Sequence, residues 1–168
     1  MNFEPPTLPY PDTKPVGAAD FYFAINATFR FIHRRLGMEG LKKYWSELGA
    51  NYFMPVTELW KKRDLAGVAE YWRAFFAAEP GAEVQVNEAT DSVTLNVKFC
   101  PAFRHLREQG REIFPCYCQH CYFVSEAIAA PAGLTLRVTG GNGSCRQIFF
   151  RRKNGAPEQK LSDITEAT

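Results

Sequence analysis

Three cysteines within six positions are the chemically most distinctive feature of this 168-residue sequence. Cys116, Cys118 and Cys121 stand in the string FPCYCQHCY. Cys118 and Cys121 form a C-x-x-C pair that we predict at the start of a helix, where backbone N–H groups and the helix dipole stabilise a thiolate. Cys100 ends a predicted strand, and Cys145 follows a glycine-rich turn. We therefore expect Cys100, Cys118 and Cys145 to converge on one site.

A thiolate metal site is the first interpretation of this cysteine cluster. Cysteine thiolates hold zinc or iron–sulfur clusters, and a C-x-x-C pair supplies two sulfurs from one helical turn. No second C-x-x-C pair is present. The predicted ligands are Cys100, Cys118, Cys121 and Cys145.

A nucleophilic cysteine is the second interpretation. Cys118 would attack an electrophilic carbon, His120 would transfer protons, and Glu126 would orient the imidazole. His105 is the other candidate base. The third interpretation is structural, because cysteine is often a small buried residue and one or two of the five would then only fill the core.

Composition and charge limit the classes of partner. The formal net charge is +2, which is too small to indicate nucleic acid or an anionic membrane as a partner. The most apolar stretch, 18–32, is interrupted by Asp20, Asn26 and Arg30 and is too short to span a bilayer. The stretch 1–14 lacks the apolar region of a signal peptide. We expect a cytoplasmic protein, whose reducing surroundings favour cysteines as ligands or nucleophiles over disulfides.

The first half of the chain has the period of amphipathic helices. We expect helices over 18–36, 39–48 and 55–62, and a fourth that begins with Asp64 as its cap and ends at Pro80–Gly81. The aromatic side chains at helical spacing predict core positions, and not ligand contacts, for Phe21, Phe29, Trp72 and Phe75.

The second half alternates apolar and polar residues with the period of strands. Valines at 84 and 86 and the run 93–99 predict a hairpin, and two further strands are expected over 134–138 and 145–151, after short helices near 101–109 and 116–130. The sequence thus predicts an α+β fold in which N-terminal helices pack on a small antiparallel sheet of about four strands. We expect an irregular arm over 1–17, one domain over 18–153 with the cysteine site in 97–150, and a flexible tail over 154–168.

The segment from Val97 to Phe150 resembles the L-2-amino-thiazoline-4-carboxylic acid hydrolase-like family. The resemblance rests on Cys100–Pro101 at a strand end, on the helix from Cys118 through Glu126, and on a glycine turn followed by Cys145. It implies a hydrolase that cleaves a C–N or C=N bond in a small heterocyclic or amidine-like substrate.

The same stretch is also similar to the small-molecule-binding domain related to bacteriochlorophyll 4-vinyl reductase. That resemblance implies metal and small-ligand binding, and it is favoured by Cys121, which stands where the hydrolase-like family usually carries an acidic residue. Two functions are therefore expected: a hydrolase that uses the cysteine-rich site, or a small-molecule-binding or redox protein with zinc or an iron–sulfur cluster. For both functions we expect the protein to bind a small molecule as substrate or ligand, and we expect neither nucleic acid nor a membrane as a partner.

Overall fold

A single mixed sheet with helices on one face forms the body of the protein. The computed structural model describes residues 20–79, 81–153 and 157–168. The helices are α1 Asp20–Glu47, the π-helical turn η1 Leu48–Tyr52, α2 Met54–Ala78, α3 Pro101–Glu108, α4 Gln119–Ala129, and the 3₁₀ turns η2 Ala130–Ala132 and η3 Leu161–Asp163. The strands are β1 Glu83–Ala89, β2 Ser92–Phe99, β3 Leu134–Gly141, β4 Ser144–Arg151 and β5 Ile164–Thr165.

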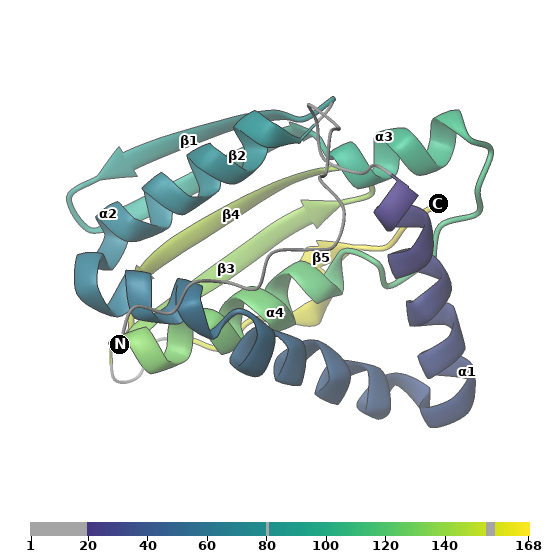
Figure 1. Cartoon of the computed structure of the whole chain (residues 1–168), viewed down its shortest axis with the longest axis horizontal. Coiled ribbons are helices and arrows are strands. Elements are labelled where there is room, and N and C mark those ends of the chain that lie inside the picture. Colours follow the sequence, from purple (N-terminus) through teal and green to yellow (C-terminus); the bar gives the residue numbers. More distant parts are fainter. Residues whose placement is uncertain (1–19, 80, 154–156) are drawn as a thin grey trace, which may run out of the picture.

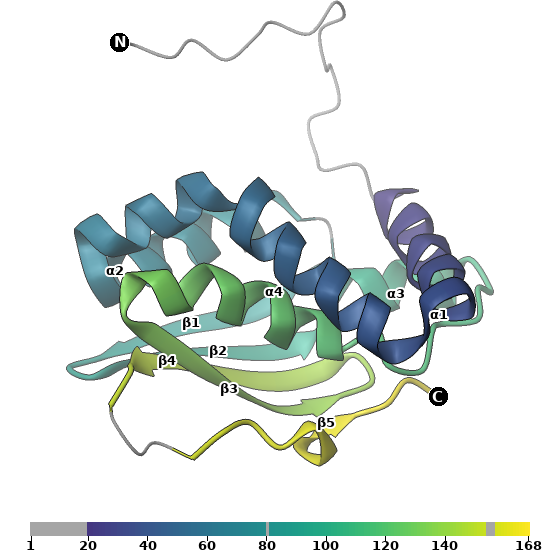
Figure 2. The same cartoon turned by 90° about the horizontal axis from the view of Figure 1, so that it is seen from below.

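The strands lie in the order β1-β2-β4-β3-β5. The first four are antiparallel, as expected, and their register places Val97 opposite Cys145. The helices α1, α2 and α4 cover one face of this sheet (Figures 1 and 2). The expected α+β fold is therefore confirmed.

The sheet has five strands, so the expected number of about four was too low. Strand β5 pairs in parallel with β3 through Ile164 and Thr165, inside the segment expected to be a flexible tail. Ile164 is buried, and the Ala167 N–H donates to the Pro115 carbonyl oxygen at 2.8 Å. A strand of two residues carries no detectable alternation, which is why the sequence did not reveal it. The arm over 1–17 and residues 154–156 lie outside the described residues.

Two of the expected breaks between helices are kinks within longer helices. In α1, Gly37 has φ 67° and ψ −171°, and in α2, Asp64 has φ 52° and ψ −139°. Gly37 can adopt this backbone because it has no Cβ, and α1 turns a corner (Figure 1). The Asp64 carboxylate accepts hydrogen bonds from Arg151 of β4, so this side chain ties the kink to the sheet.

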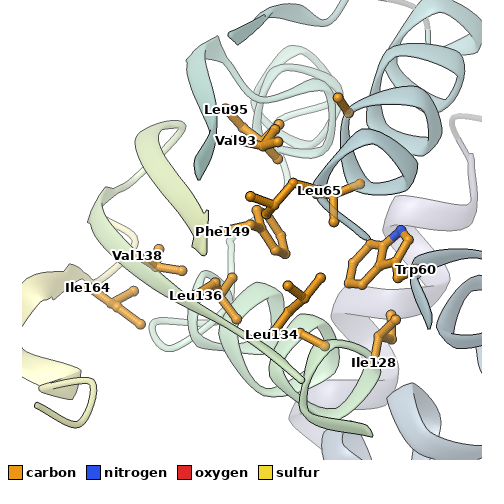
Figure 3. Packing of buried hydrophobic residues seen from close by; sticks show 13 residues of the cluster. Trp60, Leu65, Val93, Leu95, Ile128, Leu134, Leu136, Val138, Phe149 and Ile164 are labelled. Atoms are coloured by element: carbon orange, nitrogen blue, oxygen red, sulfur yellow. The ribbon is translucent and has the colours of Figure 1, made fainter. Parts of the chain in front are cut away.

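Two hydrophobic clusters stabilise the fold. The first lies between the sheet, α2 and α4 and includes Trp60, whose ring meets Phe149 of β4 edge-on at a centroid distance of 5.5 Å (Figure 3). The second joins α1 to α3 and the loop before α4, around Phe29 and Trp45. Cys118 packs against both clusters, so the cysteine region lies where they meet.

The expected core positions are only partly confirmed. Phe29 is buried, but Phe21 is 68% exposed and Phe75 is 36% exposed. Trp72 is partly buried. The helical period placed these residues on one face, but that face borders a hollow near the ends of α1 and α2 and is not closed by the sheet. The prediction was therefore wrong for Phe21 and Phe75.

Candidate functional site

Four of the five cysteines are carried by the ends of elements that meet at one end of the sheet. Cys100 directly precedes α3, Cys118 is the residue before α4, Cys121 lies in the first turn of α4, and Cys145 is the second residue of β4. The Cys100 N–H donates to the Gly143 carbonyl oxygen at 2.9 Å. This bond ties the end of β2 to the hairpin turn that precedes Cys145.

That hairpin turn is the two-residue link Asn142–Gly143 between β3 and β4. Its residues have φ 53° and φ 100°, as expected for a tight hairpin in which both central residues are left-handed. The prediction of a hairpin turn in the glycine-rich segment is thus confirmed. The turn fixes where β4 begins, and so where Cys145 lies relative to Cys100.

Cys100, Cys118, Cys121 and Cys145 line one cavity of about 400 Å³. The structure therefore places the four predicted metal ligands on the wall of one cavity. The remaining wall is mainly aromatic and aliphatic and comes from α1, α2, α4 and the helix-facing side of the sheet. Its aromatic members are Phe21, Tyr22, Phe29, Tyr44, Phe53, Tyr71, Trp72, Phe75, Phe76, Phe103 and Tyr117. Phe21, Phe29, Trp72 and Phe75, which were expected to make no ligand contacts, all border this space.

Burial holds these thiols in the protonated form. Burial, with a smaller contribution from the charge of Cys121, raises the pKa of the Cys100 thiol to about 11. Burial raises the pKa of Cys121 to about 12, and burial together with the charge of Cys121 raises that of Cys145 to about 12. The pKa of Cys118 is raised by the same two causes, partly opposed by the backbone of Asn142. Near neutral pH the four side chains are thiols, which are poor nucleophiles.

A charge on one of these cysteines raises the pKa of its neighbours, but the side chains do not surround the position of a single metal ion. A tetrahedral zinc ion with Zn–S bonds of ~2.3 Å requires sulfurs about 3.8 Å apart. In the described part of the chain, no three His, Cys, Asp or Glu side chains form a group that could hold a metal ion. The side-chain positions therefore do not fit a mononuclear zinc site. The donor set itself, four thiols without a carboxylate among them, is the chemistry of a soft metal centre.

His120 lines the same cavity as a neutral imidazole. Its Nδ1 lies 2.7 Å from the Tyr117 carbonyl oxygen, a geometry that fits an Nδ1–H donor and leaves Nε2 as the acceptor. Burial lowers the pKa of His120. The ring also packs against Phe29 and Trp45 at centroid distances of 5.2 and 6.5 Å, and Cys121 Sγ lies 3.8 Å from Nδ1.

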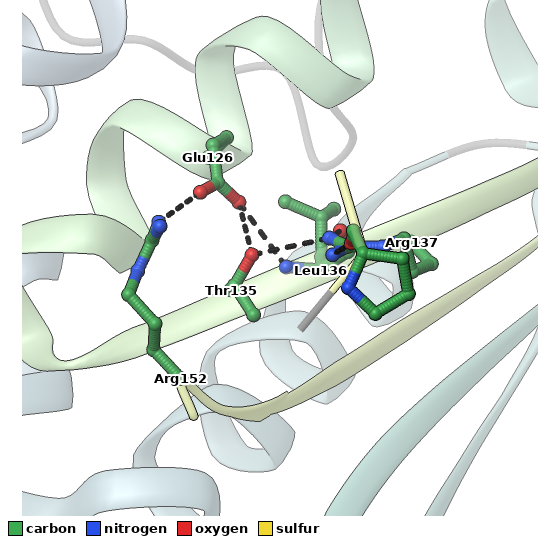
Figure 4. A network of polar contacts seen from close by, with 6 residues as sticks. Glu126, Thr135, Leu136, Arg137 and Arg152 are labelled. Carbon is green, nitrogen blue, oxygen red and sulfur yellow. Dashed lines mark hydrogen bonds and ion pairs between the residues drawn. The ribbon is translucent and has the colours of Figure 1, made fainter. Parts of the chain in front are cut away.

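Glu126 does not take part in this arrangement, so its predicted role as the carboxylate that orients His120 was wrong. Its Oε2 accepts hydrogen bonds from Thr135 Oγ1 at 2.9 Å and from the Leu136 N–H at 3.2 Å, and its Oε1 pairs with Arg152 (Figure 4). It borders a separate polar hollow. Glu126 lies five residues after Cys121, so its side chain projects from another side of α4. There its carboxylate accepts a hydrogen bond from a backbone N–H at the unpaired edge of β3.

Cys116 and His105 are also absent from the wall of the cavity. Cys116 lies against the C-terminal segment, with its Sγ 3.7 Å from Glu166 Oε1. Burial, followed by the charge of Glu166, raises the pKa of Cys116. Of the three cysteines in the FPCYCQHCY string, Cys116 is therefore the one that the fold separates from the others.

Several polar residues of the cavity were not predicted from the sequence. The Tyr22 hydroxyl donates to Glu79, which joins the start of α1 to the end of α2, and Gln147 and Ser125 are buried residues of the wall. Burial, together with Glu79, raises the pKa of Tyr22. Among these polar residues, Gln147 is the one that the sequence could have indicated, because it is a polar residue on the apolar face of an alternating strand.

No helix in the described ranges combines the length and the hydropathy that crossing a membrane requires. No protein-family model and no curated protein matches this sequence.

Proposed function

We propose that the protein binds a small molecule in the cysteine-lined cavity and holds a soft metal centre there through Cys100, Cys118, Cys121 and Cys145. The observation that carries the proposal is that thiols from three separate segments border one largely aromatic space. Four thiols on the wall of one cavity, with no carboxylate among the cysteines' described partners there, form a donor set that suits a soft metal.

An iron–sulfur cluster is the centre that we favour over zinc. A cluster has several metal atoms, so its cysteine ligands stand farther apart than the sulfurs around one zinc ion. Four thiols from three segments of the chain suit the ligand set of such a cluster, whereas no group among the described residues could hold a single ion. Binding would release the thiol protons, because thiolates are the ligands. The five free cysteines support a reducing, cytoplasmic location as part of this proposal.

The test is anaerobic reconstitution of the purified protein with ferrous iron and sulfide. Iron and acid-labile sulfide per chain are measured, together with the absorption of the cluster, and a parallel sample receives zinc. We expect iron and sulfide to bind, and we expect Cys100→Ser, Cys118→Ser, Cys121→Ser and Cys145→Ser each to reduce both strongly.

Cys116→Ser is the matched control, because it removes a thiol of the same string that does not border the cavity. It should bind iron and sulfide as the parent protein does. Zinc binding without iron would replace the cluster by a zinc site, and equal metal content in all five variants would contradict the proposal.

A hydrolase that uses Cys118 is the second candidate. Cys118 directly precedes α4, and because burial and the charge of Cys121 raise its pKa despite the backbone of Asn142, a base such as His120 would have to remove its proton. His120 Nε2 would take the proton of the Cys118 thiol and pass it to the nitrogen as the sulfur adds to the carbon of a C=N bond. The C–N bond would then break with loss of the amine, and water would hydrolyse the resulting thioimidate, which releases the product and restores the Cys118 thiol. The Tyr117 carbonyl oxygen, instead of Glu126, would orient His120. Turnover of amidine and thiazoline substrates by metal-free protein, lost in Cys118→Ala, would establish this alternative.

A further inference from the structure

The aromatic part of the cavity wall continues from the cysteines to the protein surface. Beside the cysteines, the Tyr117 ring contacts Phe29 and Phe103 at centroid distances of 5.3 and 5.6 Å, and all three rings border the cavity. Phe21, at the start of α1, and Phe75, near the end of α2, border the same cavity and are 68% and 36% exposed. The cavity therefore has an apolar wall and an apolar rim.

This rim lies where the start of α1 meets the end of α2. The Tyr22 hydroxyl donates to Glu79 there, and Glu79 is the residue that caps the end of α2. The volume of about 400 Å³ falls within the range of about 300–1,000 Å³ that is usual for small-molecule sites. A ligand that enters beside Phe21 and Phe75 thus meets aromatic side chains before it meets the cysteines.

The wall offers no counter-charge to an anion. Among the described residues that border the cavity there is no lysine or arginine, and His120 is the one histidine. The His120 ring packs against Phe29 and Tyr117 at centroid distances of 5.2 and 5.1 Å, and its Nδ1 lies 2.7 Å from the Tyr117 carbonyl oxygen. Arg107 does not border the cavity, and it donates to Asn142 Oδ1 at 2.6 Å. A carboxylate or phosphate inside the cavity would therefore lose its hydration without compensation.

Negative charge on the wall is limited to one carboxylate. Glu79 is the only aspartate or glutamate among the described residues that border the cavity, and its Oε2 already accepts the hydrogen bond from Tyr22. It lies at the rim, so a cation deeper in the cavity would have no carboxylate beside it. An uncharged molecule loses the least hydration on entry, and burial of its apolar surface favours binding.

We infer that the ligand of this cavity is an uncharged, mainly apolar molecule, which enters at the rim formed by α1 and α2 and reaches the cysteines. This inference rests on the proposed ligand-binding function and specifies its ligand class, but it does not require the metal centre. It sets aside the carboxylic acid substrate that the hydrolase-like resemblance implies, because such a substrate is an anion near neutral pH.

Three naphthalene derivatives of matched size test the ligand class by calorimetric titration. 2-Acetylnaphthalene is uncharged, 2-naphthoate has a carboxylate oxygen in place of its methyl group, and 1-(2-naphthyl)ethylammonium has an ammonium group in place of its carbonyl oxygen. We expect 2-acetylnaphthalene to bind about tenfold more tightly than either charged probe, because only it enters without burying an uncompensated charge. Comparable or tighter binding of either charged probe, or no binding of 2-acetylnaphthalene, would overturn the inference.

Exposed phenylalanines provide variants that locate the binding without disturbing the core. Phe75→Ala should weaken binding of 2-acetylnaphthalene several-fold. Phe75→Lys should also reduce its preference over 2-naphthoate, because it adds the missing positive charge at the rim. Phe31 is exposed as well but does not border the cavity, so Phe31→Ala and Phe31→Lys should leave affinity and preference unchanged. Equal effects at positions 75 and 31 would contradict the assignment.

The same titrations separate the ligand class from the proposed function. A charged probe that binds tightly, and that Phe75→Ala weakens but Phe31→Ala does not, would reject the uncharged class and keep ligand binding in the cavity. If none of the three probes binds, ligand class and ligand binding both fail. Iron and sulfide per chain then still test the metal centre on their own. Melting temperatures of the four variants confirm that each one folds.

Discussion

A negative charge on Cys121 would raise the pKa of each of the other three cysteines that line the cavity. Cys121 contributes to the raised pKa values of Cys100, Cys118 and Cys145, whereas its own pKa is raised mainly by burial. In the proposed metal centre Cys121 is one of four thiolate ligands, so its replacement by a harder donor should weaken metal binding. In the hydrolase alternative, Cys121 has no role in the reaction. There it stands at a position where the family that the sequence resembles usually carries an acidic residue.

We therefore predict that Cys121→Asp loses the bound iron and sulfide, because a carboxylate oxygen is a hard ligand that suits different metals from a thiolate. Cys118→Ala should lose both metal and any activity. The measurement is metal per chain, read beside turnover of amidine and thiazoline substrates. Cys116→Asp is the control that should retain metal. Full activity of Cys121→Asp, with no metal in the parent protein, would leave the nucleophilic cysteine as the better explanation.

At the scale of elements, α4 is positioned by an unusually close approach of the π-helical turn η1. A Cβ placed on Gly49 of that turn would lie 2.4 Å from the Val124 carbonyl oxygen and 2.8 Å from Ala127 Cβ. Only glycine fits there. Because α4 carries Cys121 and His120, this contact sets the depth of the site relative to α1 and α2.

Gly49→Ala should consequently destabilise the protein by about 1–3 kcal/mol, the usual cost of overpacking, and should weaken metal binding by shifting α4. Thermal unfolding and iron content are the two readouts. Ala50→Ser, an exposed change in the same turn, should alter neither by a measurable amount. An unchanged melting temperature in Gly49→Ala would show that η1 and α4 are farther apart than described.

Strand β5 positions the other side of the site. It pairs with β3 at Gly140 and Gly141, immediately before the Asn142–Gly143 turn that leads to Cys145. Gly141 permits this pairing, since a Cβ there would lie 2.1 Å from the Thr165 carbonyl oxygen.

Ile164→Ala should lower the free energy of unfolding by about 2–5 kcal/mol, as for other large-to-small changes in a core, because Ile164 is only 4% exposed. Denaturant titration measures the loss. Thr165→Ala removes a neighbouring, exposed side chain and serves as the control. Equal stability of the two variants would mean that β5 does not cover the core.

For the whole molecule, the two hydrophobic clusters are joined at the residues that carry the site. Cys118 and Val124 pack against both clusters, and the cavity is bordered by members of each, such as Phe29 and Ile128. We therefore expect one cooperative unfolding transition for the described domain, with the site lost as a unit and not in halves.

Trp60→Ala and Trp45→Ala probe the two clusters separately, since each tryptophan is fully buried in one of them. Each should cost about 3–5 kcal/mol and lower the same single melting transition by on the order of 10 °C. Circular dichroism and calorimetry would record it. A second transition that persists at the parent temperature would show that the clusters unfold independently.

The sequence by itself determined the features that depend on local periodicity and backbone chemistry. The alternation in 93–99 defined β2, the glycine-rich segment before Cys145 defined a hairpin turn, and Gly37 marked a break in α1. Each is set by neighbouring residues alone: by the period of two in a strand, or by the need for a positive φ. The predicted α+β fold followed from the order of such elements.

Only the tertiary structure decided which side chains share a space. It grouped Cys100 and Cys145 with the C-x-x-C pair and excluded Cys116, although Cys116 is closer in sequence, because the chain turns between 116 and 118. It directed Glu126 to the edge of β3, and it opened the aromatic face of α1 and α2 onto a cavity. The helical period shows which residues share a face, but long-range packing determines whether the sheet, another helix or an empty space lies opposite that face.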